Sequence, residues 1–115
     1  CEYLALEGLG QLTYTINKVR NSLFRDLAIR GVILTMYDGR TNLAADVLHE
    51  VQEFFKEKVF QAVIPRSIRL AEAPSYGMPI STFAPDSSGA LSYAALAKEL
   101  LISDKVQVPI VQEAN

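Results

Sequence analysis

Cysteine and histidine are nearly absent from this sequence, which has one of each, Cys1 and His49, among 115 residues. A single cysteine excludes a disulfide within the chain, and one cysteine with one histidine is too small a set for a Cys/His zinc site. His49 stands among glutamates and valines without a cysteine or serine partner, so we interpret it as a surface histidine and not as a catalytic group. We predict no metal site in this chain.

Long apolar runs are missing as well. No stretch approaches the roughly 18 to 20 residues of a membrane span, and the first residues lack the basic and then apolar pattern of a signal peptide. The formal net charge of -2 argues against a surface that is basic over its whole extent, so any nucleic-acid site must be a local patch. With 50% hydrophobic and 21% charged residues, the composition is typical of one compact soluble domain. We therefore predict a cytoplasmic protein without a membrane anchor.

The sequence also contains no phosphate-binding loop. Such a loop follows the pattern G-x-x-x-x-G-K-[ST], in which backbone N–H groups and a lysine hold the phosphates. The nearest glycines, Gly8 and Gly10, have no lysine in the required place. We therefore assign no catalytic residue to this chain and predict that it hydrolyses no ATP by itself. Because its first residue is Cys1 and not methionine, we expect a piece of a longer protein.

Apolar spacing predicts three longer helices. Steps of three and four residues indicate an amphipathic helix over about 5–24, built on Leu6, Leu9, Leu12, Ile16, Val19 and Leu23. Helical spacing returns over 43–55, with Thr41 or Asn42 as the N-cap. The last helix begins near Ser87 or Ser88, and the helical pattern ends at Ser103.

Three short runs predict strands, at 29–36 (IRGVILTM), at 59–64 (VFQAVI) and, shorter, at 79–83 (PISTF). The turn signal Asp38-Gly39 closes the first of them. Helices and strands alternate, and the strands are too apolar to be exposed on one face. The predicted fold is therefore an α/β layer with parallel strands.

Polar and turn-forming residues gather where two of these strands end, in TMYDGRTN at 35–42 and in IPRSIRLAEAPSYG at 64–77. In an open parallel sheet, ligands bind in the crevice beyond the carboxyl ends of the strands. The alternative is that the prolines and glycines only shape a turn and that the arginines are solvated. Two such loops side by side favour a binding site.

Four segments resemble a known family: CEYLALEGLGQL, GVILTMYDGRTNLAADVLHEV, KVFQAVIPRSIRLAEAPSYGMPI and SSGALSYAALAKEL. Together they resemble the C-terminal half of the ParA/Soj chromosome- and plasmid-partition ATPases, relatives of MinD. IPRSIRLAEAPSYG is the most specific part. The resemblance implies the C-terminal half of a P-loop, Rossmann-like parallel sheet flanked by helices. Residues 1–102 would belong to the ATPase domain, and 103–115 would be a tail that is disordered or packs against a neighbour.

The resemblance also implies a function for the full-length protein. Such a protein binds ATP with Mg, forms a homodimer with nucleotide between the subunits, binds DNA nonspecifically and is stimulated by a ParB-type partner. It would be cytoplasmic and associated with the nucleoid. Neither ATP nor Mg is expected to bind tightly to this chain alone, because the family carries its phosphate-binding loop in the N-terminal half.

Site residues follow from the same resemblance. Met36, Pro65 and Arg66 would flank the adenine base, where apolar surface suits a planar ring. DNA phosphates would be contacted by four basic residues, Arg40, Arg66, Arg69 and Lys98. A second function stays open, that of a stand-alone α/β interaction module derived from the family, with no nucleotide chemistry of its own. A reading frame that continues upstream into a glycine-rich lysine loop would favour the ATPase.

Overall fold

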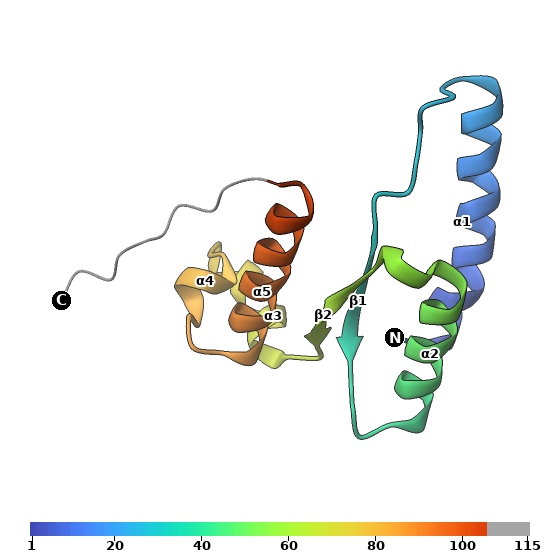
Figure 1. The fold of residues 1–115 in the computed structure, drawn as a ribbon. Helices are drawn as coiled ribbons and strands as arrows, with labels where there is room; N and C mark the ends of the chain where they lie inside the picture. The colour runs from blue at the N-terminus through green and yellow to red at the C-terminus, as the bar shows by residue number, and fades with distance from the viewer. Residues whose placement is uncertain (106–115) are drawn as a thin grey trace.

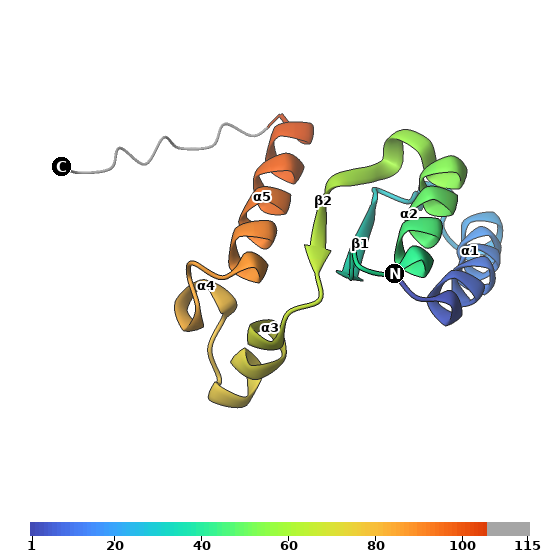
Figure 2. The same cartoon turned by 90° about the horizontal axis from the view of Figure 1, so that it is seen from below.

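A computed structural model describes residues 1–105, which form a two-stranded parallel sheet with helices on both sides. The elements follow the chain in the order α1 (Tyr3–Ser22), β1 (Val32–Tyr37), α2 (Asn42–Phe55), the short 3-10 turn η1 (Lys56–Lys58), β2 (Val59–Pro65), α3 (Ile68–Glu72), the second 3-10 turn η2 (Ala73–Tyr76), α4 (Ile80–Phe83) and α5 (Ser88–Ser103). Figure 1 shows α1 and α2 on one side of the strands and α3, α4 and α5 on the other, and Figure 2 shows the same division from below. The predicted α/β class is confirmed.

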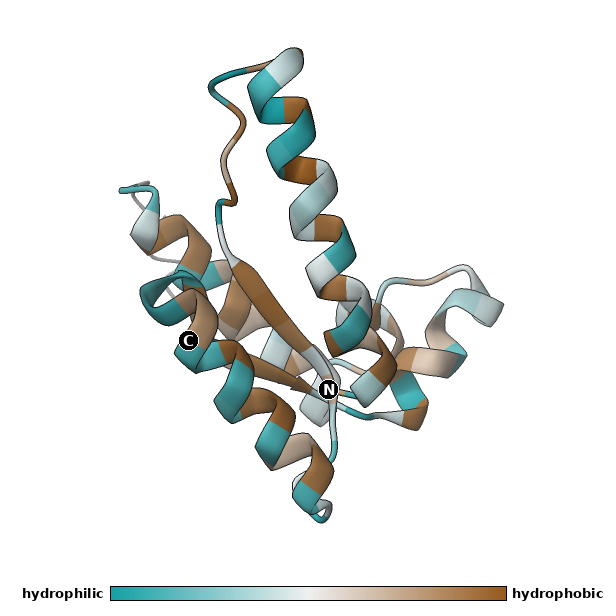
Figure 3. Cartoon of the chain, turned by 90° about the vertical axis from the view of Figure 1, so that its right-hand side faces the viewer, coloured by the Kyte–Doolittle hydropathy of each residue, from teal (hydrophilic) through white to brown (hydrophobic). Residues whose placement is uncertain are grey.

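The sheet joins β1 and β2 in parallel, as their apolar runs predict. The paired residues are Val32 with Val59, Leu34 with Val63 and Tyr37 with Pro65. Figure 3 shows that hydrophobic residues follow the strands, whereas hydrophilic and hydrophobic residues alternate along the outer helices. Each strand has only one neighbour within residues 1–105, so the sheet is narrow.

One hydrophobic core cluster lies between β1 and α2, and further buried side chains of β2, η2 and α5 are Ile64, Ala73, Ala90 and Leu96. Val47, Val51 and Phe55 stand four residues apart on one face of α2 and are buried together with Leu34 of β1. Thr41 is the N-cap of α2, because its Oγ1 accepts a hydrogen bond of 3.2 Å from the N–H of Ala44. One of the two predicted caps is thereby confirmed.

Helix α1 lies over the same core, but its apolar face is only partly covered. The helix begins two residues earlier and ends two residues earlier than the predicted 5–24. Leu6 and Leu9 pack against the core cluster, whereas Leu12 stays 55% exposed. The three-and-four spacing predicted the helix correctly and overstated its burial.

The strand predicted at 79–83 is wrong, since this segment forms the helical turn α4. The carbonyl oxygen of Pro79 accepts hydrogen bonds from the N–H groups of Thr82 and Phe83, which closes the turn. The Phe83 ring stacks on Tyr76, with 5.0 Å between the ring centroids. The spacing of three residues between Ile80 and Phe83 is compatible with a helix. A run of five residues is too short to distinguish the helical period of about 3.6 residues from the strand period of two.

Helix α5 begins as predicted, with the Ser87 hydroxyl accepting a hydrogen bond of 3.2 Å from the N–H of Ala90. A Cβ atom at Gly89 would lie 2.6 Å from the Cγ of Leu70, so only glycine lets the start of α5 approach α3 this closely. The predicted boundary after residue 102 falls in the last turn of α5. The predicted tail falls mainly on 106–115, outside the described residues. No helix within residues 1–105 is long and apolar enough to cross a membrane.

Candidate functional site

The carboxyl ends of β1 and β2 meet, as the positions of the two loops predict. Tyr37 pairs with Pro65 at the end of the sheet, and the N–H of Arg66 donates a hydrogen bond of 3.0 Å to the carbonyl oxygen of Tyr37. The loops after the two strands therefore begin side by side. Ligands are expected at this edge of a parallel sheet.

Met36 has an unusual backbone at this point. Its φ is 53°, in the left-handed region that residues with a side chain rarely adopt. The register of the two strands shifts between Leu34 and Tyr37, so the left-handed residue coincides with an irregularity in the ladder. The Met36 side chain is 50% exposed and does not belong to the core. Such local strain often accompanies binding sites.

A cavity of about 530 Å³ opens beside Met36 at the strand ends. It is lined by Thr35, Met36, Ile64, Pro65, Arg66, Ser67, Ile68, Leu70, Ala71 and Tyr93. The three residues predicted to flank a base, Met36, Pro65 and Arg66, therefore line one cavity. Most of the lining is apolar, one guanidinium stands at it, and its volume lies within the range of about 300 to 1,000 Å³ for small-molecule sites. A cavity of this size and lining can hold a small ligand with an apolar surface.

A second hollow of about 390 Å³ lies on the side of β1 that faces the start of α1. Met36 and Arg66 line both cavities and so stand between them. Asp38, Thr41 and Glu2 contribute the polar groups of this second hollow. Two neighbouring hollows with mostly apolar linings therefore lie at the strand ends.

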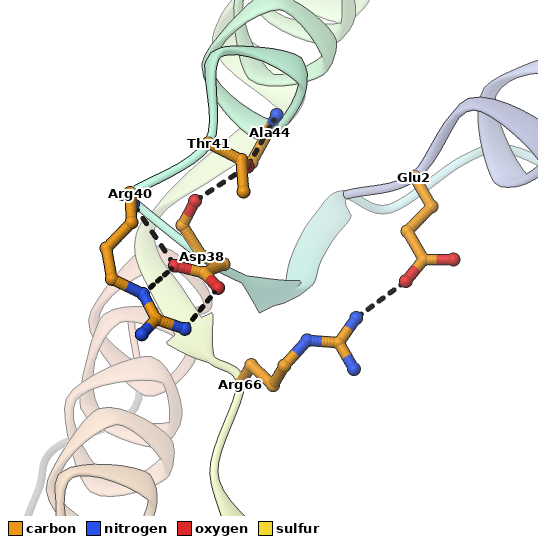
Figure 4. A network of polar contacts seen from close by, with 6 residues as sticks. All are labelled: Glu2, Asp38, Arg40, Thr41, Ala44 and Arg66. Atoms are coloured by element: carbon orange, nitrogen blue, oxygen red, sulfur yellow. Dashed lines mark hydrogen bonds and ion pairs between the residues drawn. The ribbon is translucent and has the colours of Figure 1, made fainter.

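Asp38 and Arg40 form a paired group just after β1, drawn in Figure 4. Two guanidinium nitrogens of Arg40 donate to the Asp38 carboxylate, at 2.9 Å from Nε and 2.7 Å from Nη2. The Asp38 carbonyl oxygen accepts from both the N–H and the hydroxyl of Thr41, which ties this pair to the start of α2. The Arg40 side chain is 88% exposed, so it can also reach an external anion.

This contact lowers the pKa of Asp38 to about 2, chiefly through the hydrogen bond from the Arg40 side chain and then through the Arg40 N–H. Because the pKa is depressed in the folded state, the resulting stabilisation is present above the ordinary value of 3.8 and is lost as the pH falls toward 2. We expect Arg40→Ala to return the Asp38 pKa toward 3.8. A carboxyl-carbon NMR titration measures this shift.

The matched control is Arg25→Ala, because Arg25 lies in the exposed segment before β1, at the other end of the strand. This substitution should leave the Asp38 titration unchanged. A wild-type Asp38 that already titrates at its ordinary value would show that the bidentate pair does not persist in solution.

Arg66 lies near the pair of Asp38 and Arg40, whereas Arg69 and Lys98 lie on α3 and α5. Arg66 extends toward Glu2 and is 2.6 Å from its carboxylate (Figure 4). Arg69 lies on α3, 3.8 Å from Glu72 one turn away. Lys98 is exposed on α5. Exposed ion pairs contribute little to stability, so a phosphate can replace these carboxylates at low cost.

Three residues of the site were not predicted. Tyr93 lines the apolar cavity from α5, a long-range placement for which the sequence has no signal. Glu2 pairs with Arg66 across 64 positions of the chain, which is equally invisible in the sequence. Asp38 was read only as a turn residue, although its place directly after a strand could have marked it.

No group of three or more His, Cys, Asp or Glu side chains within residues 1–105 could hold a metal ion. Among residues 1–105, Arg66 is the one cation in the lining of the apolar cavity.

Comparison with known proteins places these features in a family. The family model described as the CobQ/CobB/MinD/ParA nucleotide binding domain matches residues 5–80. Over 109 residues the chain is 48% identical to the chromosome partitioning protein ParA of Myxococcus xanthus, covering 95% of this chain and 38% of that protein. Over 100 residues it is 54% identical to the sporulation initiation inhibitor protein Soj of Bacillus subtilis, covering 87% and 40%.

A third relative has a similar extent. The chromosome partitioning protein ParA of Caulobacter vibrioides is 46% identical over 105 residues, covering 91% of this chain and 39% of that protein. The chain thus spans between 38% and 40% of the length of these three relatives. The similarity includes both strand-end loops, because the family match ends at residue 80.

Proposed function

We propose that this chain is the C-terminal portion of a ParA/Soj-type ATPase that acts in chromosome or plasmid partition. The proposal starts from the family, because the chain belongs to the CobQ/CobB/MinD/ParA nucleotide binding domain family. The observation that carries this proposal is the cavity at the ends of two parallel strands, where Met36, Pro65 and Arg66 come together. In this proposal the chain supplies the base end of the nucleotide site. Residues outside the chain supply the phosphate end.

The residues of this chain bind and orient the base. Met36 and Pro65 offer apolar surface to a flat ring, and Tyr93 lines the cavity from α5. Arg66 lines both hollows, and its guanidinium can donate to a ribose or a phosphate oxygen. When bound, Mg-ATP supplies the phosphoanhydride bond that the full-length protein hydrolyses.

The same edge of the molecule would bind DNA. Arg40 is an exposed cation in the loop after β1, and Arg69 is one on α3 after β2. Lys98 is a third on α5, next to Glu99, which contacts the middle of β2 and not its carboxyl end. Exposed arginine side chains bind DNA phosphates, and such contacts do not depend on the base sequence. We propose nonspecific DNA binding by an ATP-dependent homodimer in the cytoplasm, at the nucleoid, with stimulation by a ParB-type partner.

In the full-length protein that this proposal assumes, Arg69→Ala and Arg40→Ala should each weaken DNA binding about equally on unrelated sequences. Each should also reduce the salt slope by about one unit, because each removes one phosphate contact. ATP binding should be unchanged. The measurement is the DNA affinity of the ATP state on two unrelated duplexes over a salt series.

Arg25→Ala is again the matched control, since it removes the same charge at the other end of β1. It should leave the salt slope unchanged. If Arg40→Ala and Arg69→Ala keep the wild-type slope and lose ATP binding, both arginines belong to the nucleotide site instead. If the full-length protein binds neither nucleotide nor DNA, a stand-alone interaction module is the better description.

A further inference from the structure

Glu99 makes a contact that the proposed site does not use. It lies on α5, and its carboxylate accepts two backbone hydrogen bonds from β2, at 2.7 Å from the N–H of Gln61 and 2.9 Å from the N–H of Ala62. Both oxygen atoms are engaged, one by each donor. A charged acceptor makes such bonds roughly twice as strong as neutral ones.

The two donors lie where β2 departs from a regular strand. Between the first two paired positions, β1 advances from Val32 to Leu34 while β2 advances from Val59 to Val63. Consecutive N–H groups of a regular strand point to opposite sides, so two neighbours reach one carboxylate only where the strand is irregular. Backbone donors that leave the ladder need another partner, and Glu99 provides it.

This irregularity lies directly before the candidate site. Ile64 and Pro65 at the end of β2, and Arg66 directly after it, follow this irregularity and line the apolar cavity. Tyr93, which lines the same cavity, lies on α5 six positions before Glu99. One carboxylate therefore joins the two elements that bring Arg66 and Tyr93 to the cavity.

We propose that Glu99 is a positioning residue of the base cavity: it holds the irregular part of β2 and fixes α5 against that strand. The direction of the strand end at Pro65 and Arg66 and the place of Tyr93 then both depend on Glu99. This inference rests on the proposed function only where it assigns a base to the cavity. The link from Glu99 to Arg66 stands on the contacts alone.

Helix α5 keeps other anchors when Glu99 is changed, so variants are expected to fold. Gly89 lies close against Leu70 near the start of α5, and Leu96 is buried in its middle. Arg30 donates hydrogen bonds to Ser103 and Asp104 at its end. Loss of the Glu99 contact should thus loosen the irregular part of β2 without releasing the helix.

The test uses the 115-residue chain with Glu99→Ala and Glu99→Gln, followed by NMR. In Glu99→Ala, hydrogen exchange at the Gln61 and Ala62 amides should accelerate on the order of 10- to 100-fold. This is the protection that a hydrogen bond to a charged acceptor provides. Glu99→Gln keeps one carbonyl oxygen, so one of the two amides should stay protected. The amide signal of Arg66 and the ring signals of Tyr93 should move in Glu99→Ala and return part of the way in Glu99→Gln.

Adenosine is the probe for the cavity, and its affinity should fall several-fold in Glu99→Ala and recover partly in Glu99→Gln. Glu57→Ala is the control, because Glu57 is an exposed carboxylate in the turn before β2. It should change none of these readouts.

Unchanged exchange at Gln61 and Ala62 would overturn the inference. So would faster exchange with unmoved Arg66 and Tyr93 signals, because Glu99 would then serve only the local packing of α5. If the wild-type chain binds no adenosine, the proposed function fails, and the Arg66 and Tyr93 signals alone decide the role of Glu99.

Discussion

The purified 115-residue chain is expected to release no phosphate from Mg-ATP. Phosphoryl transfer depends on groups that position the phosphates and neutralise their charge, and the sequence contains no glycine-rich lysine loop to do so. Among residues 1–105, the apolar cavity at the strand ends has one cation, Arg66, in its lining. Phosphate release measured at millimolar Mg-ATP checks this expectation.

Arg66→Ala is the informative control for that measurement. A contaminating ATPase gives the same turnover with the wild-type chain and with the variant. Turnover that depends on magnesium and disappears in Arg66→Ala would contradict the division of the site between this chain and residues outside it.

Self-association at high concentration is the second large effect that we expect. Leu23, Ile68 and Phe54 are 82%, 78% and 72% exposed, and each strand lacks a second neighbour within residues 1–105. Exposed apolar side chains and open strand edges favour association between chains. Light scattering over a concentration series should show growing particles.

Substitutions at two adjacent phenylalanines distinguish an effect on self-association from an effect on stability. Phe54 is 72% exposed, so Phe54→Ser should reduce association with little change in melting temperature. Phe55 is 9% exposed and belongs to the core, so Phe55→Ala should lower the free energy of unfolding by about 3 to 5 kcal/mol. A strictly monomeric wild-type chain that melts sharply at high concentration would count against the expected association.

Most of the fold could be predicted because its signals are local. The caps Thr41 and Ser87 precede apolar spacing of helical period, and the two β-branched runs are closed by turn residues. The segment 79–83 could not be assigned, because its helical turn depends on Pro79 and on the contact between Tyr76 and Phe83. Five residues hold too little periodicity to outweigh such contacts.

The candidate site could be predicted in part for the same reason. Met36, Pro65 and Arg66 lie at the ends of neighbouring parallel strands, which the order of the elements already places together. Tyr93 and Glu99 come from α5, and their contacts depend on how that helix sits against β2. The left-handed φ of Met36 likewise depends on the register of the sheet. No local pattern encodes these features.

An NMR titration of the chain with adenosine, and separately with inorganic tripolyphosphate, tests the division of the nucleotide site most directly. Adenosine should shift the amide signals of Met36 and Arg66 and the ring signals of Tyr93, because these residues line the apolar cavity. Tripolyphosphate at the same ionic strength should leave the Tyr93 ring unmoved. Shifts from tripolyphosphate alone, or adenosine shifts confined to the opposite side of the sheet at α1 and α2, would contradict the assignment of the base to this cavity.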